Sequence, residues 1–230
     1  MSDPAIQSQF SEFYTRKKSP HLYPTEFVIR AFLGNYPKLE LDKTTYQGSK
    51  ILDLGYGDGR NMQLLHNLGF DIFGVEIDER INKLTLARLN EIGISADLRY
   101  GSNSALPFDD VFFDYMLACH ACYYVKEGEQ FGDNIKEIAR VMRADGTVIC
   151  SLPMADSYIL EDAENLGNGH MRIRKDYFGL RNGTIFRAFA DEADIISAFS
   201  PYFKHFAVGF CDDNYWGIRQ KVWIVACKRR

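Results

Sequence analysis

The chain has 230 residues, of which 46% are hydrophobic and 25% charged, and its formal net charge is −4. This composition is typical of a globular domain, and the acidic balance argues against a general electrostatic grip on nucleic acid or on an anionic membrane. No apolar run is long enough to cross a bilayer, the first residues lack the basic start and apolar core of a signal peptide, and the five cysteines are scattered. We therefore expect one domain, 1–230, in the cytoplasm, with free thiols.

Residues 1–47 are expected to form a helical cap that precedes the main sheet. A short, aromatic-rich helix is predicted over Gln9–Arg16, and a second over Glu26–Tyr36, with Thr25 as a plausible N-cap and Pro37 as the stop. Three residues of this segment are candidate lid residues, although half-buried packing is an equal alternative for each: Tyr14, His21 and Tyr23.

Strand and helix patterns then alternate over residues 48–153. Strands are predicted at Lys50–Leu54, Asp71–Ile77, Ala96–Tyr100, Phe113–Cys119 and Thr147–Leu152. Helices are predicted over about Asn61–Leu68, from Asp78 to Ile92 and over about Glu129–Arg143, before a turn at Asp145-Gly146. Alternation of this kind predicts βαβ units and a mostly parallel sheet.

The pattern weakens over residues 154–190, which are interpreted as an insertion or lid. Two extended runs within it, Met171–Arg174 and Thr184–Phe189, are candidates for pairing. Three basic residues are candidates for binding an anionic acceptor, with a solvated face as the preferred interpretation: Arg172, Arg174 and Lys175. A helix capped by Asp191 is predicted to Phe199, followed by strands at His205–Phe210 and Gln220–Cys227.

The most informative stretch is I-L-D-L-G-Y-G-D-G-R-N, which starts at Ile51. A dinucleotide-binding turn has the spacing G-x-G-x-x-G, but here Gly59 comes one residue early, and no P-loop is present. Asp53 would repel a pyrophosphate and would attract a cation. This stretch therefore favours a nucleoside that carries positive charge, although a helix N-cap is a competing role for Asp53 alone.

A second carboxylate, Glu76, ends the next predicted strand. A carboxylate at the tip of the neighbouring strand is the usual partner of ribose hydroxyls in doubly wound folds. Because the carboxyl ends of parallel strands share one edge of the sheet, Glu76 is expected to lie near the glycine turn.

Four motifs, in order, now suggest a family. The glycine stretch, F-G-V-E-I-D, L-P-F-D-D-V-F-F-D-Y and V-M-R-A-D-G-T together resemble the motif series of class I S-adenosylmethionine-dependent methyltransferases, over residues 48–153. The resemblance implies an α/β fold, a Rossmann-like doubly wound sheet of seven strands in an α/β/α sandwich, mostly parallel with the last strand antiparallel. Residues 48–153 would be the cofactor-binding core, and residues 191–230 would complete the sheet.

The resemblance also implies a cofactor, S-adenosyl-L-methionine, with S-adenosyl-L-homocysteine as product. Carried over by position, Asp53, Gly55 and Gly57 would hold the methionine part. Glu76 would accept both ribose hydroxyls, and Ile77 would lie against the adenine. The family commonly has Gly-Asp-Ala where this chain has Gly101-Ser102-Asn103, so Ser102 or Asn103 would meet the adenine amine. The predicted cofactor-binding set is Asp53, Gly55, Tyr56, Gly57, Gly59, Asn61, Glu76, Ile77, Ser102, Asn103, Ala118 and Cys119.

The end of the fourth strand carries the candidates for the chemistry. His120 is a candidate general base because its reference pKa suits proton transfer. Zinc at Cys119-His120-Ala-Cys122 is disfavoured because no second ligand pair follows, so no metal is expected. Tyr123 and Tyr124 are candidates for shaping the acceptor site, with half-buried packing as the alternative.

Methyl transfer to a small-molecule acceptor is the activity that the resemblance implies. We expect a monomer or a homodimer with no membrane partner, and the acidic balance disfavours nucleic acid as a partner. A nicotinamide-dependent oxidoreductase shares the architecture but not the glycine spacing. A regulatory protein that only binds S-adenosylmethionine or S-adenosylhomocysteine, and an enzyme that methylates protein or RNA, remain open alternatives.

Overall fold

The computed structural model describes residues 9, 10, 12–14 and 22–230. The strands are β1 (Lys50–Leu54), β2 (Asp71–Glu76), β3 (Ala96–Tyr100), β4 (Phe113–Ala118), β5 (Tyr124–Val125), β6 (Met142–Pro153), β7 (Glu164–Gly167), β8 (His170–Arg172), β9 (Ile185–Arg187), β10 (Phe203–Tyr215) and β11 (Ile218–Arg229). The α-helices are α2 (Glu26–Leu33), α3 (Met62–Asn67), α4 (Glu79–Glu91), α5 (Phe131–Val141) and α6 (Glu192–Phe199). Short 3-10 helices are η1 (Lys43–Thr45) and η2 (Tyr158–Leu160), and residues 9, 10 and 12–14 are also helical.

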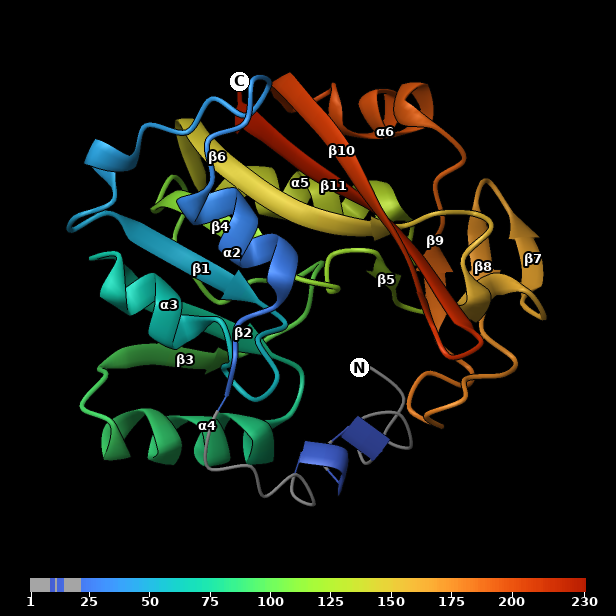
Figure 1. The fold of residues 1–230 in the computed structure, drawn as a ribbon, viewed down its shortest axis with the longest axis horizontal. Coiled ribbons are helices and arrows are strands. Elements are labelled where there is room, and N and C mark those ends of the chain that lie inside the picture. The colour runs from blue at the N-terminus through green and yellow to red at the C-terminus, as the bar shows by residue number, and fades with distance from the viewer. Residues whose placement is uncertain (1–8, 11, 15–21) are drawn as a thin grey trace.

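Seven strands form the main sheet in the order β10-β11-β6-β4-β1-β2-β3 (Figure 1). The five strands from β3 to β6 pair in parallel, and β11 runs antiparallel to both of its neighbours. The predicted Rossmann-like sheet, with its last strand antiparallel, is thereby confirmed. The chain moves outward in one direction from β1 to β3 and in the other from β4 to β6. The carboxyl end of β1 therefore lies at the switch point where such sheets bind ligands.

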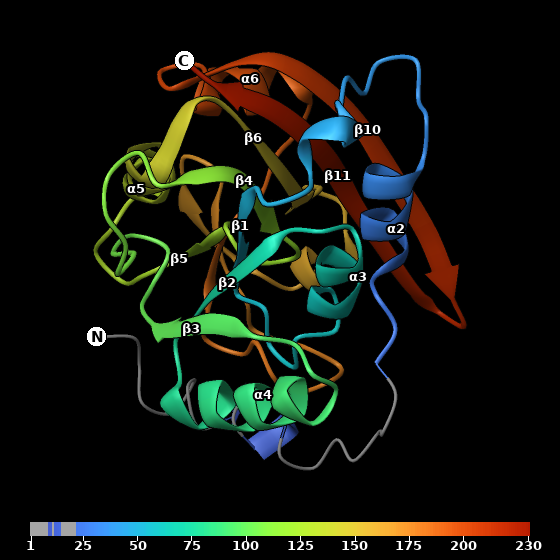
Figure 2. The same ribbon diagram turned by 90° about the vertical axis from the view of Figure 1, so that its left-hand side faces the viewer.

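The two faces of β1 are covered by different helices. Leu52 and Leu54 belong to a buried cluster that includes residues of α5 and α6. Ile51 belongs to a second cluster, formed with residues of α2, α3 and α4. Figure 2 shows α2 and α3 on one side of the sheet and α5 on the other. This arrangement is the predicted α/β/α sandwich, and it follows from strands that are apolar on both faces.

Two predicted helix starts are confirmed together with their caps. The side chain of Asp78 accepts a hydrogen bond from the backbone of Arg80 at the start of α4. Asp191 does the same for the backbone of Asp194 in α6. Both carboxylates satisfy backbone donors that the first turn of a helix leaves unpaired.

Helix α2 begins after Thr25, as predicted, but it ends at Leu33 and not at Tyr36. The backbone of Gly34 is already extended, with φ −72° and ψ 165°, although its N–H still bonds to the carbonyl of Arg30. The ammonium group of Lys43 then donates a hydrogen bond to the carbonyl of Leu33 at 2.8 Å. This bond satisfies one of the terminal carbonyls, so the helix stops before Pro37 is reached.

The end of α5 and the start of β6 differ from the prediction by a few residues. The helix ends at Val141, and β6 already begins at Met142, beside Phe113 of β4. Its register then shifts, and Asp145 has φ 59°. The predicted turn at Asp145-Gly146 is therefore a bulge inside the strand, which is how an extra left-handed residue is absorbed without ending a sheet strand.

Strands β10 and β11 are longer than predicted and form a hairpin that continues past the sheet. Trp216 and Gly217, both with positive φ (50° and 96°), make the two-residue connection. Two consecutive positive φ values match the turn that suits the twist of a hairpin. The outer half of this hairpin is largely exposed, and its polar run Asp212-Asp213-Asn214 interrupts the apolar alternation by which strands are recognised.

The insertion forms a second sheet, in the order β5-β9-β8-β7. The predicted pairing of its two extended runs is confirmed, with Met171 opposite Phe186. The fourth partner was not predicted: β5, only two residues long, comes from the loop after β4 and places Tyr124 opposite the same Phe186. The insertion is thus attached to the loop that follows the carboxyl end of β4.

None of the helices in the described part of the chain is long and apolar enough to cross a membrane. All five cysteines lie in that part and are free thiols, three of them buried.

Candidate functional site

The glycine turn between β1 and α3 is fixed from the side of α4. Gly55, Gly57 and Gly59 have φ values of 65°, 57° and 73°, a region that favours glycine. The hydroxyl of Thr85 donates to the carbonyl of Gly57 at 2.9 Å, and Arg88 donates to the carbonyl of Asp58 at 3.0 Å. The result is a rigid turn that lacks side chains at three positions, as close approach of a ligand to the backbone requires.

Sequence reasoning missed Thr85, although a signal was present. Ile81, Thr85 and Leu89 are spaced by four residues and are the buried residues of α4. A polar residue within an apolar helical stripe needs a buried hydrogen-bond partner. Here that partner is the glycine turn.

The N-terminal residue Tyr14 lies over this turn. A Cβ atom built on Gly57 would be 2.3 Å from the hydroxyl oxygen of Tyr14. Burial, with the nearby carboxylates of Glu76 and Asp58, raises the pKa of this phenol. Of the three candidate lid residues, Tyr14 lies over the glycine turn, and its role as a lid stays a prediction. Tyr23 is 77% exposed, and His21 lies outside the described residues.

Replacing Gly57 by alanine is expected to impair cofactor binding more than folding. The left-handed conformation costs a non-glycine residue about 1–2 kcal/mol, and the new methyl group would displace Tyr14. Gly93→Ala is a matched control, because Gly93 has φ 74° and a methyl group added there would have nothing within 4 Å. We expect similar losses in Tm for both variants but weakened binding of S-adenosylmethionine only in Gly57→Ala. Unchanged affinity in Gly57→Ala would contradict the proximity of the ligand to this turn.

Asp53 is a buried carboxylate without a partner. Its side chain is 1% exposed, and neither oxygen has a hydrogen-bond partner among the described residues. Burial raises the pKa of Asp53 well above its usual range, and the nearby Glu76 and Asp58 raise it further. The competing role as a helix N-cap is wrong, because α3 has Asn61 at that position. An orphaned carboxylate of this kind suits a cationic ligand.

Glu76 lies at the end of β2 and contacts the glycine turn directly. Its carboxylate accepts the backbone N–H of Gly57 at 3.0 Å and that of Ile77 at 2.8 Å. Burial raises its pKa, and these two backbone bonds oppose the shift. The two N–H bonds hold the carboxylate in place, while its remaining lone pairs can accept further hydrogen bonds. Glu76 therefore stays the predicted ribose ligand, with Ile77 beside it.

Asn103 is oriented by the loop after β4. Its side-chain amide donates to the carbonyl of Ala121 at 2.9 Å and to that of Tyr124 at 3.1 Å. Both N–H groups are thus used, and only the carbonyl oxygen is left to meet a ligand, as an acceptor. The side chain of Ser102 is 3.5 Å from that of Ser104. Of the two residues predicted for the adenine amine, Asn103 has the more defined acceptor.

Tyr56 supports the turn from behind. Its hydroxyl bonds to Asn82 of α4, and its ring lies against Gly74 of β2, where a Cβ atom would be 2.5 Å away. Only the backbone of Tyr56 is left to meet a ligand at this turn, because the side chain is 4% exposed and points to α4 and β2. These contacts favour a supporting role for the side chain of Tyr56.

Thr25, at the start of α2, joins the cap to the turn and to β4. Its backbone N–H donates to the side chain of Asn61 at 3.0 Å, and its hydroxyl accepts from the thiol of Cys119 at 3.4 Å. Burial raises the pKa of Cys119 to about 12, so the thiol stays protonated. Asn61 and Cys119 are thus positioned by α2, and Ala118 beside Cys119 is fully buried.

His120 follows β4 in a left-handed conformation, with φ 56°. The hydroxyl oxygen of Ser151 accepts its backbone N–H at 2.8 Å and lies 3.1 Å from its Nδ1. Ser151 is fully buried, and Nδ1 is the acceptor that its own proton can reach. With Ser151 as the donor to Nδ1, the imidazole proton is on Nε2.

Burial, with Arg181 and Arg60 nearby, lowers the pKa of His120 to about 4. The ring is therefore a neutral hydrogen-bond donor near pH 7 and a weak base. The predicted general-base role stays untested, but this environment favours a donor. No group of three or more metal-ligand side chains lies together in the described residues.

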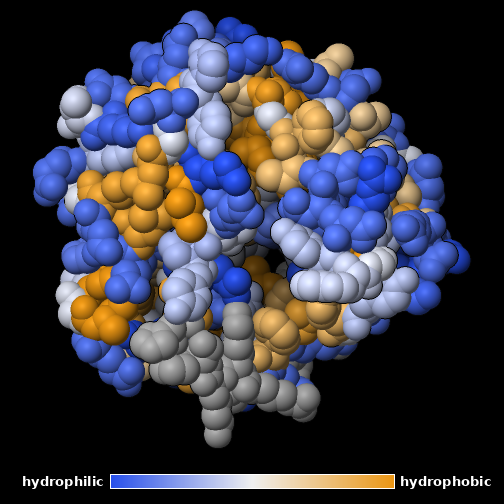
Figure 3. All heavy atoms as spheres, viewed as in Figure 1, coloured by the Kyte–Doolittle hydropathy of each residue, from blue (hydrophilic) through white to orange (hydrophobic). Residues whose placement is uncertain are grey.

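Tyr123 and Tyr124 lie between the cofactor edge and the insertion. Their rings stack, with centroids 5.0 Å apart, and both meet Phe186 of β9 edge on. Phe10 in turn meets Tyr124 at 6.3 Å. Figure 3 shows this face hollowed near its centre, where Figure 1 places the end of β1 next to β5 and β9. The two tyrosines are therefore brought beside the predicted cofactor residues, as expected for the acceptor side.

The three basic residues predicted as candidates for binding an anionic acceptor form ion pairs with acidic residues. Arg172 pairs with Glu127 at 2.9 Å, Arg174 with Glu164 at 3.3 Å, and Lys175 with Asp162 at 3.9 Å. These ion pairs are partly or largely exposed, which agrees with the preferred interpretation as a solvated face. A different residue, Arg181, donates to the hydroxyl of Tyr124 at 3.3 Å. Sequence reasoning missed it, because a single arginine in a glycine-containing loop gives no pattern.

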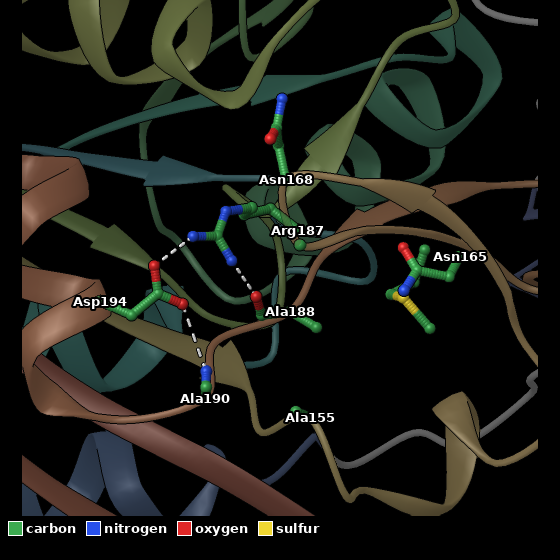
Figure 4. Close-up of a pocket in the computed structure, with 9 residues that line it drawn as sticks. Ala155, Asn165, Asn168, Arg187, Ala188, Ala190 and Asp194 are labelled. Atoms are coloured by element: carbon green, nitrogen blue, oxygen red, sulfur yellow. Dashed lines mark hydrogen bonds and ion pairs between the residues drawn. The ribbon is translucent and has the colours of Figure 1, made fainter.

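A second hollow, of about 610 Å³, is lined by residues of the insertion and by Asp194 of α6. Figure 4 shows Arg187 pointing to Asp194 across it, and Asp194 also accepts the backbone N–H of Ala190 at 3.2 Å. Its charged groups are thus paired with one another, and none of the predicted site residues lines it.

Comparison with known proteins agrees with this geometry. A family model described as "Methyltransferase domain" matches residues 52–150. A curated relative, the ubiquinone biosynthesis O-methyltransferase of Maricaulis maris, is 27% identical over 107 residues, which are 46% of this chain and 41% of the relative. The chain spans about half the length, or less, of the curated relatives that it matches.

Solved structures share the fold across nearly the whole chain. A protein from Pyrococcus horikoshii has a TM-score of 0.67 at 16% identity, covering 95% of this chain and 99% of that one. A protein from Methanosarcina mazei described as a SAM-dependent methyltransferase has a TM-score of 0.65 at 17% identity, covering 90% and 98%. These findings agree with the resemblance seen in the motifs: residues 52–150 match a methyltransferase domain, and the solved structures share the fold.

Proposed function

We propose that this protein transfers the methyl group of S-adenosylmethionine to a small-molecule acceptor. The observation that carries the proposal is the unpartnered, buried carboxylate of Asp53 beside the glycine turn, with Glu76 bonded to the same turn. A cation and a ribose are the ligand groups that this pair of carboxylates accommodates together, and S-adenosylmethionine contains both. A pyrophosphate would meet two carboxylates there, which repel it.

The residues of the chain bind and orient. Asp53 would offset the positive charge of the methionine part, Glu76 would accept the ribose hydroxyls, and Asn103 would accept from the adenine amine. When bound, the cofactor supplies an activated methyl group. The protein then aligns the acceptor with it, in a site from which Tyr14 excludes water.

The acceptor is proposed to lie against Tyr123, Tyr124 and His120. These residues follow β4 directly and border Ala118 and Cys119, two of the predicted cofactor-binding residues. His120 would donate from Nε2 and would be a poor base, given its pKa of about 4. The acceptor atom therefore has to be nucleophilic without losing a proton to this histidine, as an ionised oxygen or a neutral amine is.

The name of the curated relative, an O-methyltransferase, makes an oxygen a candidate acceptor atom for this chain as well. We propose it only as a class to test, alongside amines. Methylation of protein or RNA is less consistent with an acceptor site bordered by Tyr14 and by the insertion, because a macromolecule would have to displace both.

Thermal unfolding with a panel of ligands tests the proposal. S-adenosylmethionine or S-adenosylhomocysteine at about a hundredfold excess over Kd should stabilise the protein by about 2.7 kcal/mol, or roughly 5–10 °C in Tm for a chain of this size. NAD and ATP should have no such effect. Stabilisation by NAD alone would favour an oxidoreductase and overturn the proposal. Tight binding of S-adenosylmethionine without turnover on any acceptor panel would favour the regulatory alternative.

A further inference from the structure

Arg181 is a largely buried arginine in the loop between β8 and β9. Its side chain is 26% exposed. It donates from Nε to the hydroxyl of Tyr124 at 3.3 Å and from Nη1 to the carboxylate of Asp176 at 3.1 Å. Unlike Arg172 and Arg174, it does not lie in a surface ion pair. A guanidinium in this position has lost most of its hydration, so its donors need partners from the protein or from a ligand.

The loop around Asp176 is built to hold this side chain still. The carboxylate of Asp176 is fully buried and accepts the backbone N–H groups of Phe178 at 3.1 Å, Leu180 at 3.0 Å and Arg181 at 3.1 Å. The backbone N–H of Asp176 in turn donates to the side chain of Asn182 at 2.8 Å. The carboxylate therefore fixes both the loop and one edge of the guanidinium, which keeps the other edge oriented before any ligand arrives.

Most donors of Arg181 are left over after its contacts with Tyr124 and Asp176. An arginine has five N–H donors, and Tyr124 and Asp176 use one each, so three are left that no described residue accepts. The charge of Arg181 acts on His120, Tyr123, Tyr124 and Tyr158, which come from separate segments around the end of β4 and η2. The hydroxyl of Tyr124 accepts from Arg181 and so keeps its own proton free to donate.

We propose that Arg181, with the hydroxyl of Tyr124, binds a carboxylate group of the methyl acceptor. This inference rests on the proposed function, because it names the chemical class of the acceptor for the same site. A carboxylate matches the planar edge of a guanidinium and accepts two parallel hydrogen bonds from it. The stacked rings of Tyr123 and Tyr124 and the edge of Phe186 add an apolar surface beside it, which suits an aromatic or other flat acceptor body.

The arrangement also explains why the insertion is attached to the loop after β4. Tyr124 is part of β5, which pairs with β9, and Arg181 precedes β9 by a few residues. The carboxylate site is therefore fixed relative to His120 and to the cofactor edge by strand pairing. An acceptor held by its carboxylate at Arg181 has its opposite end directed to one place, which is what selective methylation of one atom requires.

Benzoate, benzamide and benzylamine are matched probes, since they differ in charge and little in shape. Titrated into protein saturated with S-adenosylhomocysteine, benzoate should bind at least about tenfold more tightly than the other two, because a tenfold difference is the effect of one charge-assisted hydrogen bond. Arg181→Met should remove this preference, and Arg181→Lys should keep part of it. Arg174→Met, which removes an exposed arginine of the same insertion, should leave it unchanged.

Equal binding of benzoate and benzamide by the wild type would overturn the proposal without needing any variant. An equal loss of the preference for benzoate in Arg174→Met and Arg181→Met would also overturn it, because the preference would then come from the net charge of the protein and not from Arg181. The affinity for S-adenosylhomocysteine, measured in the same samples, separates the two levels. If the wild type does not bind S-adenosylhomocysteine, the proposed function is refuted. If it binds S-adenosylhomocysteine but does not prefer benzoate, only the role of Arg181 is refuted.

Discussion

Replacing Glu76 by alanine should weaken the binding of S-adenosylmethionine at least about a hundredfold. The carboxylate is expected to accept both ribose hydroxyls, and hydrogen bonds to a charged group contribute roughly 1.5–3 kcal/mol each. The same change leaves the backbone N–H of Gly57 without the acceptor it has now at 3.0 Å. The glycine turn therefore loses both a ligand contact and one of its own supports.

The fold should survive this change. Glu76 is 8% exposed and burial raises its pKa, so removing the carboxylate also removes the cost of holding a buried charge. Glu76→Gln is the finer variant, because its amide oxygen can still accept from Gly57, and we expect intermediate affinity. Glu91→Ala, at the exposed end of α4, serves as the control. Titration calorimetry measures the affinities, and wild-type affinity in a folded Glu76→Ala would show that the ribose is bound elsewhere.

Replacing Asp53 by asparagine should have opposite effects on stability and on binding. The carboxylate is buried without a hydrogen-bond partner, so neutralising it should stabilise the ligand-free protein by about 2 kcal/mol near pH 8. The same change removes the counter-charge for the methionine part of the cofactor. We therefore expect a higher Tm together with weaker binding of S-adenosylmethionine.

The stability difference between the wild type and Asp53→Asn should depend on pH. Because the folded pKa of Asp53 is raised, the unfolded chain ionises first as the pH increases. The folded wild type then loses stability relative to Asp53→Asn, starting near the unfolded pKa of about 4 and continuing until the folded group ionises. Below that range the two proteins should differ little.

Asp71→Asn is the control for Asp53→Asn, since Asp71 lies at the exposed start of the neighbouring strand. Its Tm should follow the wild type at every pH. Chemical denaturation across the pH range measures the difference. An Asp53→Asn variant that is less stable than the wild type at pH 8 would mean that the carboxylate has a favourable partner in the ligand-free protein.

The parts of this fold that were predictable depend on local rules. The strand β1, the glycine turn and α3 follow from an apolar run, three glycines and helical spacing, and Asp78 and Asp191 mark helix starts by their side-chain chemistry. These signals lie within a few residues of one another. The order of four motifs then implied the sheet, because class I methyltransferases arrange them in one topology.

The parts that were not predictable depend on distant contacts. Strand β5 has two residues, and only its pairing with β9 makes it a strand. Arg181 becomes part of the site because Asp176 folds a loop around it, and neither residue belongs to a periodic pattern. For His120 the sequence offers only the reference pKa of a histidine. In the fold, burial lowers this pKa to about 4, and Ser151, 31 residues away in the sequence, contacts Nδ1.

The central claim is that Asp53 and Glu76 together seat S-adenosylmethionine at the glycine turn. A crystal structure of the protein with S-adenosylhomocysteine tests it most directly. We expect the ribose hydroxyls within hydrogen-bond distance of the carboxylate of Glu76, and the amino group of the homocysteine part on the side of Asp53. A ligand bound away from Gly55–Gly59, or one whose ribose does not contact Glu76, would contradict this account.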